Sequence, residues 1–385
     1  RCSRDWSSDV CSSDLLRMYY FPYGVPITLD GLDYFSYAME LSKTGKFPEY
    51  PNFANNGWPS FLSIFFSLYK SQNFLDYIMI QRYLSVTISV LTIVPAYLFC
   101  GRFFPKKYAM IGASLFAFDP RLIQNSLLGT TEPLFILLIT SAFVLFFNTN
   151  RKIVYSSFLL VGFSSIVRAE GLFVFLPLII MFSLKNRKEH RVIFKIILVA
   201  LIFLSVVLPV ALFRINTQGS DALTGRVIEG TNHVFYSSGS NSLEFLKVAI
   251  QNIVKLMGWS LVPIFVLLLP LGLYFFNKNR DGQKKTLLVL IGFMLLPILY
   301  ALSFIPDTRY VYPLFPIFAL ISSFTIKGLL EKSKRKKFLL SITIGLIFLA
   351  SVTFLELKKF DYEHQREAFA IAQKVNSLEI GRAHV

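Results

Sequence analysis

Charged side chains are scarce in this sequence. They make up 16% of its 385 residues, whereas soluble globular domains carry about 25%. Acidic residues are the rarer kind, with 23 Asp and Glu against 39 Lys and Arg. In a soluble protein this basic excess would indicate nucleic-acid binding. So low a total charge does not favour a soluble protein, and we expect no nucleic-acid partner.

Cysteine and histidine are too few for a disulfide framework or a zinc site. Of the three cysteines, Cys2 and Cys11 lie in a terminal segment that we expect to be artificial, and Cys100 stands alone in an apolar run. A lone cysteine in such a run is usually a small packing residue. The four histidines show none of the spacings that zinc ligands use.

Both ends of the chain are expected to be translated sequencing adapter. Residues 5–15 read DWSSDVCSSDL and residues 379–385 read EIGRAHV. Permitted back-translations of these two strings are reverse complements over nearly all of the shorter one. We therefore expect residues 1–15 and 379–385 to be adapter, and both natural ends to be truncated.

Long apolar runs dominate the rest of the chain. Hydrophobic residues form 54% of the sequence, and apolar stretches of about 15 to 20 residues recur, each long enough to cross a hydrocarbon core about 30 Å thick. These stretches predict ten membrane spans. The predicted spans cover 82–100, 108–118, 133–147, 153–167, 171–184, 192–212, 259–276, 286–304, 311–329 and 338–355.

Basic residues gather in five short loops, which all fall on one side of the membrane if the spans alternate. The loops hold about half of the 39 Lys and Arg residues. By the positive-inside rule that side is the cytoplasm, which predicts a multi-pass protein of the plasma (cytoplasmic) membrane. The five loops are 101–107, 148–152, 185–195, 277–285 and 327–337.

The same alternation places the remaining connections on the extracytoplasmic side and requires one further span before residue 16. The predicted fold class is therefore an all-α polytopic membrane protein with about 10–11 transmembrane helices. We expect one transmembrane domain over 16–355, its first span missing, and the start of an extracytoplasmic segment at 356–378. The outward segments are 16–81, 119–132, 168–170, 214–257 and 305–309.

The first outer segment carries a carboxylate beside two short apolar stretches. Asp30 precedes a short amphipathic helix, and residues 59–70 read as a second one. Such helices can lie in the interface plane of a membrane. Asp30 is then either the N-cap of its helix or a group that meets the head group of a lipid-linked substrate. The predicted apolar face of the first helix consists of Leu32, Phe35, Ala38 and Met39.

Four segments, taken in order, resemble GT-C membrane glycosyltransferases, in particular protein O-mannosyltransferases and the aminoarabinose transferases that modify lipid A. The resemblance covers most of residues 16–330 and implies a GT-C-like helical bundle whose outer-face loop carries interfacial helices. The segments are Asp30-x3-Tyr34-x3-Ala38-x2-Leu41-x3-Gly45, TTEPLFILLITSAFVLFF with Glu132, GFSSIVRAEGLFVFLPL with Arg168 and Glu170, and SFIPDTRYVYPLFPIFAL with Arg309 and Tyr310.

The resemblance implies transfer of a hexose or pentose from a polyprenyl- or dolichyl-phosphate donor, such as dolichyl-phosphate mannose. The acceptor would be a hydroxyl of a protein, lipid or glycan at the extracytoplasmic face, as in protein glycosylation or cell-envelope synthesis. An outer-loop Asp is the family's proposed general base, and that role falls on Asp30, with Asp33 as the fallback. A carboxylate can remove a proton from the acceptor.

Arginine suits the departing phosphate, because a planar guanidinium binds phosphate oxygens and stays charged. Arg168, Arg309 and Tyr310 are the candidate donor-phosphate ligands, and Glu132 and Glu170 are candidate metal or acceptor contacts. Charges near span ends are costly without a partner or an aqueous cavity. The alternatives are that Arg168 and Glu170 are snorkelling ends of a tight turn, that Arg309 is an interfacial anchor, and that Glu132 complements a helix dipole.

A metal cofactor stays open at this point. Asp30, Glu132 and Glu170 are the carboxylates that could converge on Mg²⁺ or Mn²⁺, which prefer oxygen ligands, but no Asp-x-Asp pair occurs among them. Two other functions are alternatives for a multi-span protein. A secondary transporter would carry ionisable groups at mid-membrane, often with repeats, whereas the predicted spans are nearly free of acids. A polysaccharide ligase or polymerase would share this topology and differ in its acceptor.

Overall fold

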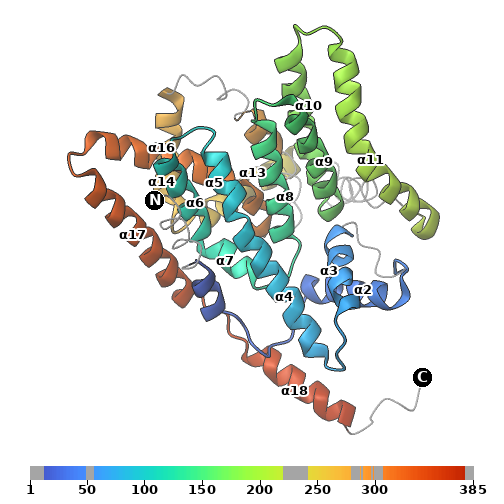
Figure 1. The fold of residues 1–385 in the computed structure, drawn as a ribbon. Coiled ribbons are helices and arrows are strands. Elements are labelled where there is room, and N and C mark those ends of the chain that lie inside the picture. The colour runs from blue at the N-terminus through green and yellow to red at the C-terminus, as the bar shows by residue number, and fades with distance from the viewer. Residues whose placement is uncertain are drawn as a thin grey trace.

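The computed structural model describes residues 13–48, 56–219, 242–278, 287, 289–295, 298 and 307–377. Every regular element in this part of the chain is a helix (Figure 1), which confirms the predicted all-α class. Helices suit a lipid environment, because each one satisfies its backbone N–H and C=O groups within a single segment. The predicted span 286–304 lies largely outside the described residues.

The helices follow one another through short connections. Most of the predicted spans have a helical counterpart with ends shifted by a few residues. The elements are α2 (Asp30–Thr44), α3 (Gly57–Leu68), α4 (Phe74–Leu91), α5 (Ile93–Cys100), α6 (Lys106–Ala117), α7 (Pro120–Ser126), α8 (Glu132–Phe146), α9 (Arg151–Val167), α10 (Gly171–Asn186), α11 (Val192–Gln218), α13 (Ser242–Leu261), α14 (Phe265–Lys278), the 3-10 helix η1 (Thr308–Leu314), α16 (Phe315–Lys332), α17 (Lys336–Leu357) and α18 (Glu363–Ser377).

Four of the described helices are long and apolar enough to cross a membrane, so the chain is a multi-pass membrane protein by length and composition. The remaining predicted spans correspond to shorter helices or to helices outside this criterion. Three of these shorter apolar helices are Gly57–Leu68, Glu132–Phe146 and Gly171–Asn186. The four long helical segments are Phe74–Cys100, Val192–Asn216, Thr308–Lys332 and Phe338–Leu357.

One predicted span is interrupted, and one short span ends within a residue of its predicted end. The span predicted over 259–276 is bent by 104° between Ile250–Leu261 and Phe265–Lys278. Pro263 lies in this break and has no backbone N–H to continue a helix. The span predicted over 108–118 ends at Ala117, because Asp119 and Pro120 begin α7. Hydropathy alone could not detect the break at Pro263, since apolar residues flank it.

Both interfacial helices predicted in the first outer segment are present, as α2 and α3. They pack on each other and on α4 (Figure 1). The face of α2 that packs inward is Tyr34, Phe35 and Ala38, against Trp58 and Leu62 of α3. Leu32 is 39% exposed and lies outside this packed face.

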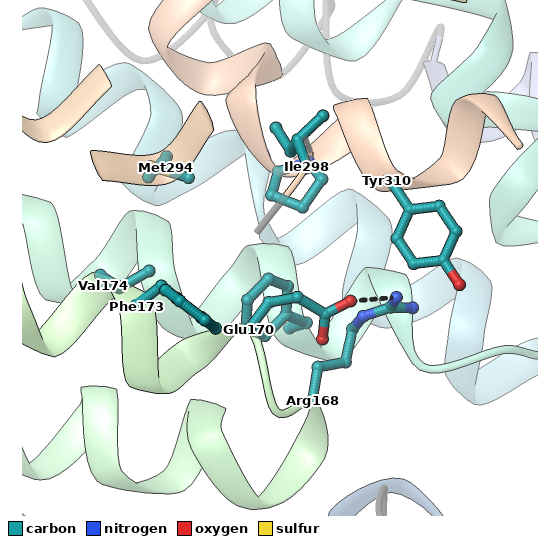
Figure 2. Close-up of a pocket in the computed structure, with 9 residues that line it drawn as sticks. Arg168, Glu170, Phe173, Val174, Met294, Ile298 and Tyr310 are labelled. Atoms are coloured by element: carbon teal, nitrogen blue, oxygen red, sulfur yellow. Dashed lines mark hydrogen bonds and ion pairs between the residues drawn. The ribbon is translucent and has the colours of Figure 1, made fainter. Parts of the chain in front are cut away.

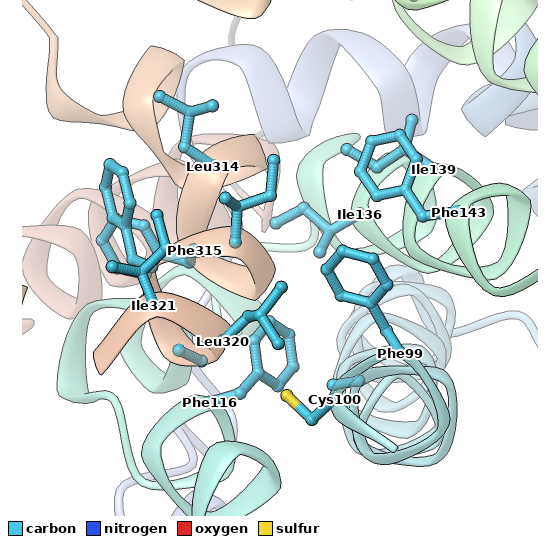
Figure 3. Packing of buried hydrophobic residues seen from close by; sticks show 14 of the residues in the cluster. Phe99, Cys100, Phe116, Ile136, Ile139, Phe143, Leu314, Phe315, Leu320 and Ile321 are labelled. Atoms are coloured by element: carbon cyan, nitrogen blue, oxygen red, sulfur yellow. The ribbon is translucent and has the colours of Figure 1, made fainter. Parts of the chain in front are cut away.

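The main core joins the middle of the chain to its C-terminal third. Figure 3 shows Phe99 and Cys100 of α5 beside Ile136 and Phe143 of α8, with Phe315 of α16 in the same cluster. Cys100 is buried and free, as expected of a packing residue. This packing holds η1 against α8, which brings two of the sequence motifs together.

Candidate functional site

The four motif segments converge at one end of the helical bundle. Asp30 begins α2, Glu132 begins α8, and Arg168 lies in the turn between α9 and α10. Arg309 lies in η1, immediately before α16. Because α8 packs on α9, on α4 and on η1, segments far apart in sequence reach the same region.

Arg168 is held by two carboxylates. Its Nη1 lies 2.6 Å from Glu132 Oε1 and its Nη2 lies 2.7 Å from Glu170 Oε1. Nη1 also donates to Thr131 Oγ1 at 3.1 Å. The guanidinium lies over the Tyr310 ring, with 5.6 Å from Cζ to the ring centroid (Figure 2). Arg168 is 8% exposed, so it is an enclosed ion pair and not a snorkelling end.

The electrostatics of this cluster follow from its burial. Enclosure lowers the pKa of the Arg168 guanidinium, but Glu170 and Glu132 together raise it well above its usual value. The group therefore stays charged, and the Arg168–Glu132–Glu170 cluster carries a net negative charge. One oxygen, Glu132 Oε2, is buried with no hydrogen-bond partner among the described residues. Glu132 thus does more than complement a helix dipole.

A second ion-pair cluster links the two ends of the chain. Arg309 Nη1 lies 3.0 Å from Asp30 Oδ2, and Arg309 Nε lies 2.6 Å from Asp307 Oδ2. Asp307 also caps η1 by accepting from the Arg309 backbone N–H at 2.9 Å. Asp30 is not a helix cap: Leu29 occupies the N-cap position with φ 52°, and no side chain caps α2. The Asp30 side chain is 52% exposed.

A polar cavity of about 460 Å³ opens beside the Asp30–Arg309 pair. This volume is within the range of about 300 to 1,000 Å³ that small-molecule sites occupy. Asp30, Asp307 and Arg309 line one part of it, and residues of α7 and of the segment between α17 and α18 line the rest. The side chains from α7 are Arg121, Gln124 and Asn125, those from the connecting segment are Phe360 and Tyr362, and α18 adds Gln365.

Some predicted site residues are not part of this cavity. Asp33 is exposed on α2 and makes no ion pair within the described chain. Arg168, Glu170 and Tyr310 line a separate pocket of about 20 Å³ (Figure 2). Glu132 lines neither of these two pockets. The structure therefore brings Asp30 and Arg309 to the cavity and holds the Arg168 cluster next to it, through Tyr310.

The carboxylates do not fit a divalent-metal site. Glu132 and Glu170 both pair with Arg168, and Asp30 and Asp307 both pair with Arg309. Within the described ranges, no three Asp, Glu, His or Cys residues form a group that could hold a metal ion. An arginine between two carboxylates supplies the positive charge that a metal would bring, so we derive no step through one.

The cavity residues that sequence reasoning missed include Arg121, Asn125 and Thr130. The available signal was their position, in the outward segment that follows Asp119. Asp119 is the N-cap of α7, because its carboxylate accepts from the Arg121 and Leu122 backbone N–H groups at 3.0 and 3.1 Å. Asp119 lies outside the four long spans, and burial raises its pKa to about 7.

Comparison with known proteins shows the fold and no closer relation. No family model matches the sequence, and no curated protein matches it. Several solved structures do match. One is the oligosaccharyltransferase of Archaeoglobus fulgidus tethered to an acceptor peptide containing the NVT sequon, with a TM-score of 0.58 and 14% identity over 91% of this chain.

Two further structures of the same archaeal enzyme agree. Its complex with an inhibitory peptide and a dolichol-phosphate, under the name AglB, gives a TM-score of 0.58 and 13% identity over 90% of this chain. Its complex with Zn and sulfate gives a TM-score of 0.56 and 14% identity over 94% of this chain. This chain spans 55% to 56% of the length of those proteins. The predicted GT-C fold is thus confirmed, through structures of an oligosaccharyltransferase.

Proposed function

We propose that this chain belongs to a glycosyltransferase that takes a sugar from a polyprenyl- or dolichyl-phosphate carrier at the extracytoplasmic face of the membrane. The observation that carries the proposal is the Asp30–Arg309 ion pair at a polar cavity, formed by residues 279 positions apart. The fold supports it, since similar structures hold a dolichol-phosphate or an acceptor peptide. A protein acceptor is favoured on the same grounds.

In the reaction, an acceptor hydroxyl oxygen forms a bond to the anomeric carbon of the sugar. The bond from that carbon to the phosphate oxygen breaks, and its electron pair leaves with the lipid phosphate. The acceptor proton passes to the Asp30 carboxylate, which is the general base. Asp30 suits this role because Arg309 orients it while half of its side chain stays accessible.

Arg309 is the phosphate ligand in this proposal. Its Nε and Nη1 bind Asp307 and Asp30, which leaves one nitrogen of the fork for an incoming oxygen. Arg168 has a different task, because both of its Nη atoms already bind carboxylates and it does not line the cavity. We assign Arg168 to positioning η1 through the Tyr310 ring.

The test compares two carboxylates on one helix. The purified chain in lipid nanodiscs is given radiolabelled sugars on dolichyl or undecaprenyl phosphate, and transfer to peptide, lipid and glycan acceptors is measured. Asp30→Asn is expected to lower transfer by about a hundredfold or more, the usual contribution of a general base. Asp33→Asn, one turn away and exposed, is the matched control and should keep full activity.

Two results would count against this assignment. Full transfer by Asp30→Asn removes the residue from the chemistry, and loss of transfer only in Asp33→Asn moves the role to the neighbouring carboxylate. Absence of transfer from every carrier by the unchanged chain, with all acceptors, would contradict the proposed function itself.

A further inference from the structure

The α7 side of the 460 Å³ cavity carries polar groups that the protein leaves unused. Asn125 and Thr130 are each 3% exposed and both line the cavity. Asn125 Oδ1 and Thr130 Oγ1 have no hydrogen-bond partner among the described residues. A buried polar atom without a partner is unfavourable. Two such atoms on one cavity wall indicate groups whose hydrogen bonds are completed by a bound ligand.

Arg121 supplies a positive charge on the same wall. Its Nη2 donates to Trp259 O at 2.5 Å and its Nε donates to Val262 O at 3.2 Å. The guanidinium also lies 5.2 Å from the Trp259 ring centroid and 4.9 Å from that of Phe354. Arg121 is 6% exposed, and no carboxylate in the described part of the chain lies within salt-bridge distance of it. Its carbonyl and ring contacts fix the guanidinium without an ion pair, and the Asp119 carboxylate interacts with its charge at longer range.

The surroundings of the two cavity arginines differ. Arg309 forms ion pairs with Asp30 and Asp307, so two carboxylates already offset its positive charge. The direct partners of Arg121 are all neutral and one carboxylate, Asp119, acts on it at longer range, which makes it the stronger attractor for an anion. It is fixed in place, because Asp119 caps α7 two residues earlier and α13 supplies the Trp259 carbonyl. A guanidinium fixed in this way binds phosphate oxygens with little loss of side-chain freedom.

From this arrangement we infer that Arg121, Asn125 and Thr130 form the subsite for the phosphorylated sugar head group of the donor. The phosphate accepts hydrogen bonds from Arg121 and from the nitrogen of Arg309 that its two carboxylates leave free, a sugar hydroxyl donates to Asn125 Oδ1, and the Thr130 hydroxyl pairs with a second sugar oxygen. The unpaired oxygen acceptor of Asn125 calls for a ligand with hydroxyl groups, and Arg121 calls for an anion. This assignment rests on the proposed function and places the donor on the α7 wall, with Asp30 on the side of the acceptor.

The experiment uses farnesyl phosphate as the probe and farnesol as its uncharged counterpart. Binding to the full chain in detergent micelles is measured from the ligand-dependent shift of thermal unfolding. Asn125→Asp keeps the side-chain shape and adds a negative charge beside Arg121. We expect it to weaken farnesyl phosphate binding by about tenfold or more. Asn150→Asp, the same change at the exposed N-cap of α9, should bind as the unchanged chain does.

A second variant guards against misfolding. Arg121→Lys keeps the charge and loses the bidentate fork, and is expected to weaken the phosphate probe severalfold while leaving farnesol unaffected. Thr130→Val should leave this probe unchanged, because farnesyl phosphate has no sugar. Unfolding without ligand shows whether each variant is folded.

The outcomes separate this inference from the proposed function. If the unchanged chain prefers farnesyl phosphate to farnesol and both Asn125→Asp and Arg121→Lys bind it equally well, the α7 subsite is wrong and Asp30 keeps its role. If the unchanged chain shows no preference for the phosphate over the alcohol, the donor class is wrong and the proposed function fails with it.

Discussion

At the scale of single residues, the most consequential interaction is the one that encloses Arg168. The side-chain exposures of Arg168 and Glu132 are 9% and 3%, so both charges have lost most of their water. Removing one partner of such a pair leaves the other charged and buried, which costs more than the pair itself contributes.

Replacing Arg168 by Met should therefore lower the free energy of unfolding by about 3 to 5 kcal/mol. Adding Glu132→Gln to the same chain should restore part of this loss, because no buried carboxylate at position 132 is then left unpaired. Thermal unfolding of the two single variants and the double variant in detergent measures the coupling. Strictly additive losses would show that Arg168 and Glu132 do not depend on each other.

The individual residues also show how far sequence reasoning reached. Residue type and motif order indicated Asp30, Glu132, Arg168 and Arg309, and these four lie together in the two ion-pair clusters. Arg121 was missed because the contacts that fix its guanidinium come from neutral partners on α13 and α17. No local pattern at residues 119–125 reports those contacts.

At the scale of elements, the N-terminus of α2 depends on a neighbouring helix. Arg82 of α4 donates to the carbonyls of Pro22, Val25 and Pro26, in the segment that leads to Asp30. Its Nε donates to Leu127 O at 3.2 Å. Arg82 is 4% exposed, so it acts as a buried clamp between the first outer segment and α7.

Replacing Arg82 by Met should release the segment 22–26, because three of its backbone carbonyls lose their donor, as does the carbonyl of Leu127. Hydrogen–deuterium exchange should become faster over residues 20–31 and stay unchanged in α16, which belongs to the main core. Transfer activity should fall while farnesyl phosphate binding persists, since Arg121 does not touch this segment. Unchanged exchange over residues 20–31 would show that other contacts hold Asp30.

Two helix starts carry a local side-chain signal that the span prediction did not use: the predicted spans began at 82 and 153, and the helices begin at Phe74 and Arg151. Asn73 accepts from the Leu75 N–H and starts α4, and Asn150 does the same for α9. The break between α13 and α14 was not predictable from hydropathy, because both halves are apolar. Whether a chain bends at a proline depends on how the two halves pack, and here Arg121 donates to the carbonyls of Trp259, at the end of α13, and of Val262, in the break itself.

At the scale of the whole molecule, the account depends on which side of the membrane the clusters face. The basic loops predict that they face outward. The structure brings Asp30 and Arg309 together from opposite ends of the chain. Its fold is similar to that of an oligosaccharyltransferase, of whose length this chain covers 55%. The charge distribution and the fold are independent observations. A measurement that reports both the proximity of Asp30 to Arg309 and the side of the membrane that they face therefore tests both.

That measurement is a cross-link in intact cells. Asp30→Cys and Arg309→Cys are combined in a chain whose native cysteines are replaced, and spheroplasts are treated with a short membrane-impermeant bifunctional thiol reagent. Proteolysis between the two positions then shows whether the fragments stay joined. The account predicts cross-linking in the double variant without permeabilisation, and none in either single variant. Fragments that separate, or that join only after the membrane is opened, would contradict it.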